Sequence, residues 1–371
     1  MFLLRSAQPA DLPALLRLAA HLDSVNLPHD VAALEALVAL SQVSFAERGR
    51  PRSVEPPLPP VGVAQAEARP ARPGTFLFVL ASDTGDVLGT SLVVAEHGTP
   101  ADPHHFLRLA VEERYSPRLQ RVFRHQLLTL GRSFSPHTEL GGLVLDPRCR
   151  RSPQRLGRAI AMVRFLFLLQ HRPRFCDVLQ AELLPPLEPD GTSRLWEYLG
   201  RPFTGLSYQE ADRLSREDRL FITHLFPSVP LYTALMPPAL REVLGAVGPE
   251  TRPVEHMLRQ LGFTFQGHID PFDGGPHLEA RLDELPLRGA LRTFPCEALL
   301  RASGEAPAGE EGAAGQLWLV TLAQADAMAG WLALLCAGTL ERPVLDARAV
   351  EQLGAARGDA LLALPLLPST R

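Results

Sequence analysis

The feature that most constrains the fold is a strand followed by an arginine-rich loop and a helix that is apolar on every side. Residues 139–145 are typical of a strand, which Asp146 and Pro147 end. Residues 148–158 are polar and rich in arginine, whereas residues 159–169 are apolar except for Arg164. A helix that is apolar all round is a buried helix. The segment therefore predicts an α/β core with a basic loop at a helix N-terminus.

The second half of this loop has the sequence QRLGRA, which fits the pattern Q/R-x-x-G-x-G/A of a pyrophosphate-binding loop. Successive backbone N–H groups at a helix start can wrap a pyrophosphate, and Gly157 leaves room for it. Arginine side chains add positive charge for phosphate groups. The pattern alone also fits an exposed basic helix start. The predicted cofactor-binding residues are Gln154, Arg155, Leu156, Gly157, Arg158 and Ala159.

The strand before the loop supplies the second part of the expected site. Backbone N–H groups of Leu143, Val144 and Leu145 can polarise a thioester carbonyl and hold the oxyanion of a tetrahedral intermediate. An amine can then attack the thioester directly, with a base to remove its proton and an acid for the leaving thiolate. Leu143 is equally compatible with a plain core position.

Several longer segments resemble the arginine N-succinyltransferase family. The most specific is IDPFDGGPHLE at 269–279, and TELGGLVLDP at 138–147 also matches. The resemblance implies a Gcn5-related acyl-CoA N-acyltransferase-like fold, an α/β mixed sheet flanked by helices, and a small C-terminal β-barrel. The remaining matching segments lie at 26–28, 164–167, 181–183, 196–200, 211–212, 230–233, 262–263 and 344–364.

This resemblance implies two domains and a reaction. Residues 1–287 are expected to form the acyltransferase-like domain, with a proline-rich loop at 50–74, and residues 288–371 the β-barrel domain. The implied reaction moves a succinyl group from succinyl-CoA, a co-substrate, to the α-amino group of arginine, and no permanently bound cofactor is expected. The family's succinyl-CoA contact maps onto Leu143. Asn26 falls in the implied substrate-side loop.

The chain departs from the family pattern at three places. The family's proton-donor histidine corresponds to Gly248, and its Arg-Gly pair corresponds to Leu184 and Pro185. The family's sequence S-P-F-W corresponds to SRLW at 193–196. Two alternatives therefore stay open beside the family reaction. One is a divergent paralogue with another amine acceptor, such as ornithine. The other is a catalytically impaired subunit that pairs with a paralogous chain, as some family members do.

Other polar residues are candidates for the acceptor side. Glu139 and Tyr232 are the predicted catalytic residues, because a carboxylate can relay the amine proton and a tyrosine can protonate a thiolate. Glu182 and Asp273 are predicted to bind substrate through their carboxylates. Tyr232 also fits a packing role, and Asp273, in the sequence Asp-Gly-Gly-Pro, also fits turn chemistry.

Composition excludes several function classes. All 37 basic residues are arginine, which removes lysine Schiff-base and Walker chemistry. The net charge of −4 offers no basic field for nucleic acid. The four cysteines form no C-x-x-C pair, which favours reduced thiols in a cytoplasmic protein.

The sequence also predicts neither a membrane segment nor a metal site. The longest apolar run, at 159–169, is too short to span a bilayer. The pairs His104-His105 and His137-x-Glu139 lack a third ligand at a suitable local spacing, so no metal is expected. The expected partners are small molecules, an acyl-CoA and an amino acid, and a homo- or hetero-oligomer is left open.

Overall fold

In the computed structural model the chain forms two compact units, each built from separate segments. Unit 1 comprises Met1–Ala95, Leu140–Cys176 and Pro286–Arg371, and unit 2 comprises Glu96–Glu139 and Asp177–Leu285. Both are α/β, with mostly antiparallel strands flanked by helices. The structure describes residues 1–21, 26–47, 74–100, 102–215, 220–300, 315–324 and 330–366.

The strands of unit 1 follow the order β11-β14-β12-β13-β1-β2-β3-β6. Strand β1 is central, because it pairs antiparallel with β2 on one side and β13 on the other. The last residues of β3 and the first residues of β6 belong to unit 2. The bounds are β1 Phe2–Ser6, β2 Thr75–Ser82, β3 Val87–His97, β6 His137–Leu145, β11 Arg292–Pro295, β12 Gln316–Leu322, β13 Leu332–Gly338 and β14 Ala360–Pro365.

Strand β2 is buried on both faces, which explains its nearly continuous apolar sequence. Leu77 and Val79 join a core cluster with the apolar residues of α1 and α2. On the alternate positions, the Phe76 and Phe78 rings lie 4.9 and 5.3 Å from the Phe167 ring of α3. The helices of unit 1 are α1 Leu12–Ala19, α2 Val31–Ala46, α3 Leu156–Gln170, α9 Leu287–Ala290, α10 Cys296–Leu299 and α11 Ala347–Leu353.

Helix α2 completes the hydrogen bonding of β2 where β1 ends. The register of β1 on β2 stops at Ser6, opposite Phe78. Beyond it, the backbone N–H groups of Thr75 and Leu77 donate to the hydroxyls of Ser44 and Ser41, at 3.1 and 2.9 Å. All of these groups are buried, so the two serines satisfy strand amides that water does not reach.

The strands of unit 2 follow the order β6-β7-β10-β9-β4-β5-β8. β6 and β7 are parallel, with Thr138 opposite Leu179 and Glu139 opposite Gln180, and the other registered pairs are antiparallel. The further bounds are β4 His104–Ser116, β5 Arg121–Ser133, β7 Val178–Glu182, β8 Leu231–Tyr232, β9 Thr264–Ile269, β10 Pro276–Arg281, α4 Arg201–Thr204, α5 Tyr208–Ser215, α6 Leu220–Leu225, α7 Pro238–Arg241 and α8 Arg252–Gln260.

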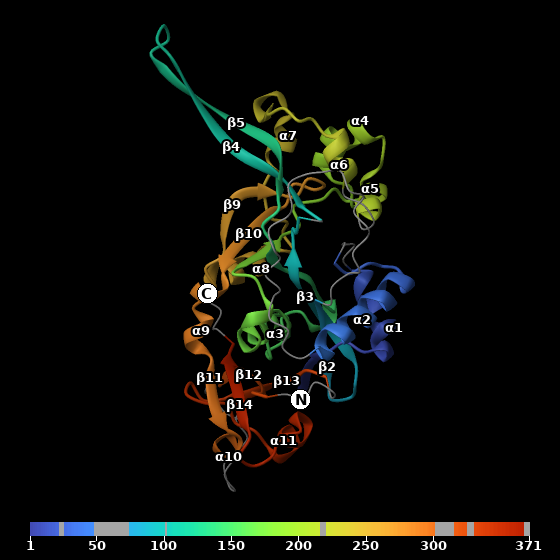
Figure 1. Cartoon of the computed structure of the whole chain (residues 1–371), viewed down its shortest axis with the longest axis vertical. Coiled ribbons are helices and arrows are strands. Elements are labelled where there is room, and N and C mark those ends of the chain that lie inside the picture. Colours follow the sequence, from blue (N-terminus) through green and yellow to red (C-terminus); the bar gives the residue numbers. More distant parts are fainter. Residues whose placement is uncertain are drawn as a thin grey trace. The chain divides into compact units, whose positions relative to one another are not determined.

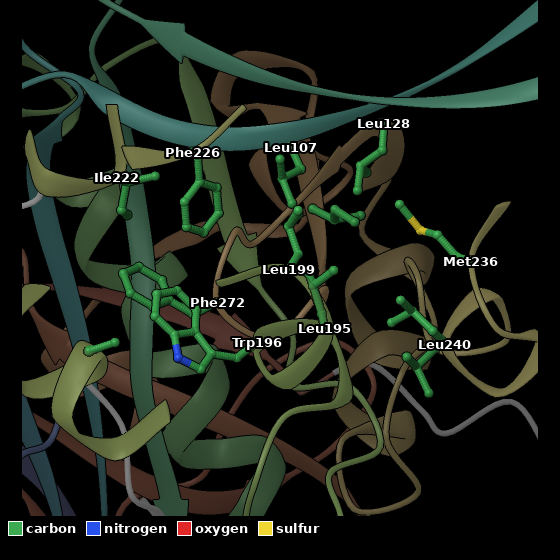
Figure 2. Packing of buried hydrophobic residues seen from close by; sticks show 13 residues of the cluster. Leu107, Leu128, Leu195, Trp196, Leu199, Ile222, Phe226, Met236, Leu240 and Phe272 are labelled. Carbon is green, nitrogen blue, oxygen red and sulfur yellow. The ribbon is translucent and has the colours of Figure 1, made fainter. Parts of the chain in front are cut away.

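The core of unit 2 is organised around Trp196, which Figure 2 shows among its apolar neighbours. Its indole is fully buried and stacks on Phe272 with ring centroids 5.1 Å apart. The indole N–H donates to the carbonyl of Leu206 at 2.9 Å, so the buried ring carries no unsatisfied donor. The segment 196–200, one turn of π-helix, holds the ring in this place.

A long hairpin of β4 and β5 extends from unit 2 (Figure 1). The two strands pair over all thirteen residues of each, from His104 opposite Ser133 to Ser116 opposite Arg121. Only their inner parts pair with other described strands, β9 and β8. Four apolar side chains on the outer part are more than half exposed: Val111, Tyr115, Leu119 and Val122. The sequence indicated only a short strand at 126–130, because exposed strands lack an apolar alternation.

Several sequence predictions are confirmed and some need correction. The strands at 75–81, 87–95 and 139–145 are present as β2, β3 and part of β6. The buried helix begins at Leu156 rather than 159, so Leu156, Gly157 and Arg158 lie in its first turn. The predicted proline-rich loop 50–74 lies outside the described residues except for Gly74. The C-terminal barrel and the boundary at 287 stay predictions. None of the described helices is long and apolar enough to cross a membrane.

Candidate functional site

The arginine-rich loop of unit 1 presents backbone amides at the start of α3. Arg155 precedes the helix in the left-handed conformation, with φ of 52°, and Arg151 has φ of 62°. The first N–H groups bonded back to the Arg155 carbonyl are those of Arg158 and Ala159. The N–H groups of Leu156 and Gly157 precede these bonds and are free of intrahelical partners. Amides that follow a left-handed residue in this way form an anion-binding nest.

Packing within the protein does not explain glycine at position 157. A Cβ added there would meet only Leu145 Cδ2, at 3.4 Å, which is an ordinary van der Waals distance. The protein's own side chains therefore leave this space open, as a ligand seated on the amides requires. Close by, repulsion from Arg155 adds to burial in lowering the pKa of Arg158. A bound anion would relieve that repulsion.

Asn26, a predicted substrate contact, packs against the strand that precedes the loop. A Cβ on Gly141 would collide with the Asn26 side chain, and one on Gly142 would lie 3.4 Å from the Asn26 carbonyl. Asn26 therefore packs on β6 immediately before Leu143. Asn26 is predicted to contact substrate and Leu143 to contact succinyl-CoA, and the two thus lie close together in the fold. Leu143 and Leu145 are half-buried, and Val144 lies in the core.

A buried cation lies under the same strand. Arg164 of α3 is 2% exposed and donates to the carbonyls of Ala161, at 3.1 Å, and Gly141, at 3.5 Å. Burial lowers its pKa to about 10, so the guanidinium is charged at neutral pH. Among the described residues no carboxylate pairs with it. A buried charge without a counter-ion is costly, and an anionic ligand would compensate it.

Unit 2 contains a cluster of buried imidazoles and carboxylates on neighbouring strands. The Nδ1 atom of His97, at the end of β3, makes a short hydrogen bond to Glu139 Oε2 on β6. The His97 ring stacks on His137 with centroids 5.2 Å apart, and both rings lie within 5.0 Å of His104 on β4. Glu139, His104 and His137 are each at most 5% exposed.

A second group of polar side chains shares His104 with this cluster. His277 of β10 is fully buried, and its Nδ1 lies 3.4 Å from His104 Nε2. Its Nε2 lies 3.6 Å from Glu182 Oε1 at the end of β7. The amide of Gln180 donates to the same Glu182 oxygen at 3.1 Å. Glu182, 28% exposed, is the member of this group that reaches solvent.

Two imidazole nitrogens in this cluster, Nε2 of His137 and Nε2 of His277, are buried without a hydrogen bond. Burial is the largest cause that lowers the pKa of His137 to about 4 and that of His277 to about 3. Both rings are therefore neutral near pH 7. A buried polar atom without a partner costs about 1–3 kcal/mol, so these two nitrogens lower the stability of the folded protein.

Gly248 packs directly on Leu184 and Pro185 at the end of β7. The N–H of Gly248 donates to the carbonyl of Leu184 at 2.8 Å. A Cβ at Gly248 would lie 2.8 Å from the carbonyl oxygen of Pro185, closer than real Cβ contacts allow. Positions at which the sequence was expected to depart from the family pattern are thus neighbours, and the loss of a proton donor at position 248 stays a prediction.

The remaining predicted residues lie elsewhere in unit 2. Tyr232 on β8 donates its hydroxyl proton to Glu112 at 2.7 Å, which raises the pKa of Tyr232 and makes it a weaker acid. Asp273 accepts the N–H of Gly275 at 2.7 Å inside a tight turn, as turn chemistry predicts. Burial, and then the charge of Asp270, raises its pKa well above the ordinary value. Catalytic and binding roles for these two residues stay predictions.

The imidazole cluster was not predicted from the sequence. Histidine pairs at local spacing lack a third ligand, whereas the structure supplies further rings from distant strands. One signal was present, because His137 and His277 both stand inside segments that otherwise follow a strand pattern. The expectation that no metal is bound stays a prediction, but its premise was incomplete.

The backbone amides at the start of α3 have the arrangement that phosphate-binding helix N-termini use. A family model described as arginine N-succinyltransferase beta subunit matches residues 61–287. The arginine N-succinyltransferase subunit beta of Pseudomonas aeruginosa is 31% identical over 289 residues, covering 76% of this chain and 77% of that protein. The arginine N-succinyltransferase of an Enterobacter species is 31% identical over 298 residues, covering 80% and 83%.

A solved structure agrees with these matches. Arginine/ornithine succinyltransferase subunit AI from Pseudomonas aeruginosa superposes with a TM-score of 0.77 at 27% identity, covering 99% of both chains. The chain belongs to the arginine N-succinyltransferase family, whose members are acyltransferases.

A histidine side chain at position 248 should disrupt the end of β7. We expect Gly248→His to lower the free energy of unfolding by about 1–3 kcal/mol, because its Cβ meets the Pro185 carbonyl. The double variant Gly248→His/Pro185→Gly should recover part of this loss, because glycine lets that backbone shift. Urea unfolding of both single variants and the double variant measures the coupling. Additive effects would contradict the contact.

The buried imidazoles should make the protein sensitive to acid. Folded pKa values of about 4 for His137 and about 3 for His277 lie below an unfolded value near 6.5. Below pH 6.5 the unfolded chain binds protons that the folded chain does not, so stability is full above pH 6.5 and falls on acidification.

Unfolding free energies between pH 7 and pH 4.5 test this dependence. Each histidine contributes a slope of up to about 1.4 kcal/mol per pH unit. His137→Asn should flatten the curve, whereas His224→Asn, which replaces an exposed histidine, should leave it unchanged. If the slope is unchanged in His137→Asn, the pKa of His137 is not lowered in the folded protein.

Proposed function

We propose that the chain transfers the succinyl group of succinyl-CoA to the α-amino group of arginine. The observation that carries this proposal is the amide nest at Leu156 and Gly157, in a chain that belongs to the arginine N-succinyltransferase family. The Gcn5-related loop pattern fits a CoA pyrophosphate seated on those amides. No covalent intermediate is needed, because the amine attacks the thioester directly.

Selection of a succinyl over an acetyl group needs a cation for the distal carboxylate. Arg164 is the best candidate in unit 1. It is buried, charged and without a carboxylate partner among the described residues, and it contacts Gly141, two residues before Leu143. The acyl chain would then lie along β6, with the carboxylate of the succinyl group on the guanidinium.

On the acceptor side, Glu182 is better placed than Glu139 to bind the substrate's cationic groups. Glu182 is partly exposed at the end of β7, whereas Glu139 is buried and already holds His97. Glu182 is also two residues from Leu184, where the chain departs from the family. A changed pocket at this point supports ornithine as the first acceptor to try beside arginine.

Release of free CoA thiol from succinyl-CoA and acetyl-CoA, with arginine, ornithine and other amines, tests the reaction. Release that depends on succinyl-CoA and arginine supports the proposed function. Release with ornithine alone would keep the chemistry and change the acceptor. Bound succinyl-CoA without release under any of these conditions would favour the alternative of an inactive partner subunit, which the glycine at position 248 supports.

The amide nest can be tested separately from catalysis. Gly157→Ala should fold normally, since its Cβ finds open space, and should weaken succinyl-CoA binding about tenfold, or about 1.4 kcal/mol. Gly157→Glu should abolish binding, because it adds both bulk and negative charge. Gly289→Glu, in the exposed part of α9, is the matched control and should bind normally. Calorimetry measures all three, and unchanged affinity in Gly157→Glu would disprove the loop assignment.

The long hairpin of β4 and β5, called the hairpin arm below, supports association with a second copy of this chain. Its outer part exposes Val111, Tyr115, Leu119 and Val122, and relatives of this chain are named as subunits. Light scattering should give a multiple of the 40.6 kDa chain mass. Tyr115→Glu combined with Val122→Glu, which stand opposite each other, should shift the mass to one chain. A wild-type protein of single-chain mass would contradict the association.

A further inference from the structure

Three imidazoles of unit 2 converge from three strands that are distant in the sequence. His97 ends β3, His104 begins β4 and His137 begins β6. One donor nitrogen from each lies within 4.8 Å of the others. Close approach is possible because Gly98 has no side chain: a Cβ there would lie 2.9 Å from His104 Cβ and 3.4 Å from His137 Cε1.

A carboxylate already orients one of these rings. Glu139 binds Nδ1 of His97, so a metal ion would take Nε2 of this ring. A histidine that ligates a metal typically donates its other N–H to a carboxylate in this way, which fixes the tautomer and the ring. The arrangement is thus of the carboxylate–imidazole–metal kind, although Glu139 itself need not touch the ion.

One nitrogen of the cluster lacks a partner that a metal ion would provide. Nε2 of His137 is buried and makes no hydrogen bond with the described residues. Metal ions bind the neutral imidazole through its lone pair, so an ion at this place would satisfy that atom.

We propose that His97, His104 and His137 form a binding site for a divalent transition-metal ion, with zinc as the leading candidate. Three imidazoles with one open position are a known zinc ligand set. Tetrahedral ligands at zinc lie about 3.3 Å apart, so the rings need to move inward by about an ångström or less. This inference does not depend on the acyltransferase reaction.

A second set of three groups, His104, Glu182 and His277, also lies within 4.8 Å. Its two outer members already face each other, because His277 Nε2 lies 3.6 Å from Glu182 Oε1, and Gln180 donates to that oxygen. The first set has the preformed carboxylate partner in Glu139, whereas Nε2 of His277 in the second set already lies beside Glu182. Both sets share His104, so variants at the other positions distinguish them.

Binding of Zn²⁺ and Co²⁺ to the tag-free, EDTA-treated protein tests the site. We expect about one ion per chain by calorimetry, visible Co²⁺ absorption bands of a nitrogen-rich site, and a higher Tm with Zn²⁺. His104→Asn and His137→Asn should weaken binding at least about a hundredfold, and Glu139→Gln about tenfold. His277→Asn should stay within about threefold of wild type, as should His224→Asn, the exposed control.

Three results would overturn the inference. No stoichiometric binding of either ion to the wild-type protein would remove the site. Loss of metal binding in His277→Asn together with normal binding in His137→Asn would mean that the ion binds the second set. That result would disprove the ligands proposed here. Loss in His224→Asn would indicate binding by surface histidines. Each variant's circular dichroism spectrum and Tm without metal separate lost ligands from lost folding.

Discussion

Close packing of backbone at the end of β7 is the constraint on which this part of unit 2 depends. A Cβ on Gly275 would collide with the Leu183 carbonyl, and one on Gly248 would meet the Pro185 carbonyl. The strand end is thus held between two glycines. This close fit fixes where Glu182 and its neighbour His277 stand, and it leaves no room for a side chain at position 248.

Each unit combines buried charge or polarity with a place for a ligand. In unit 1, the amides of α3 and the guanidinium of Arg164 both lack anionic partners in the described part of the chain. In unit 2, Nε2 of His137 is buried without a hydrogen bond beside the His97–Glu139 pair. Folded proteins keep such costs where a ligand offsets them. The family membership names the reaction class, and these unpaired groups indicate where its substrates and an ion are expected.

Local patterns predicted the parts of the chain in which burial controls sequence. Strand β2 and helix α3 were evident from their apolar runs, and the loop between β6 and α3 from its glycine and arginines. The imidazole cluster was not predictable in this way, because His97, His104, His137 and His277 meet only through strand pairing over long sequence separations. The hairpin arm was underestimated because its outer residues are solvated on both faces and show no apolar period.

The interleaving of the two units has a consequence for synthesis of the chain. The polypeptide passes from one unit to the other after residues 95, 139, 176 and 285. Strand β1 pairs with β13, which follows all of unit 2 in the sequence. A nascent chain on the ribosome therefore carries an open edge at β1 until β13 has been made, and unit 1 closes only then. Edges of this kind invite pairing with other chains, so truncated or stalled products should aggregate.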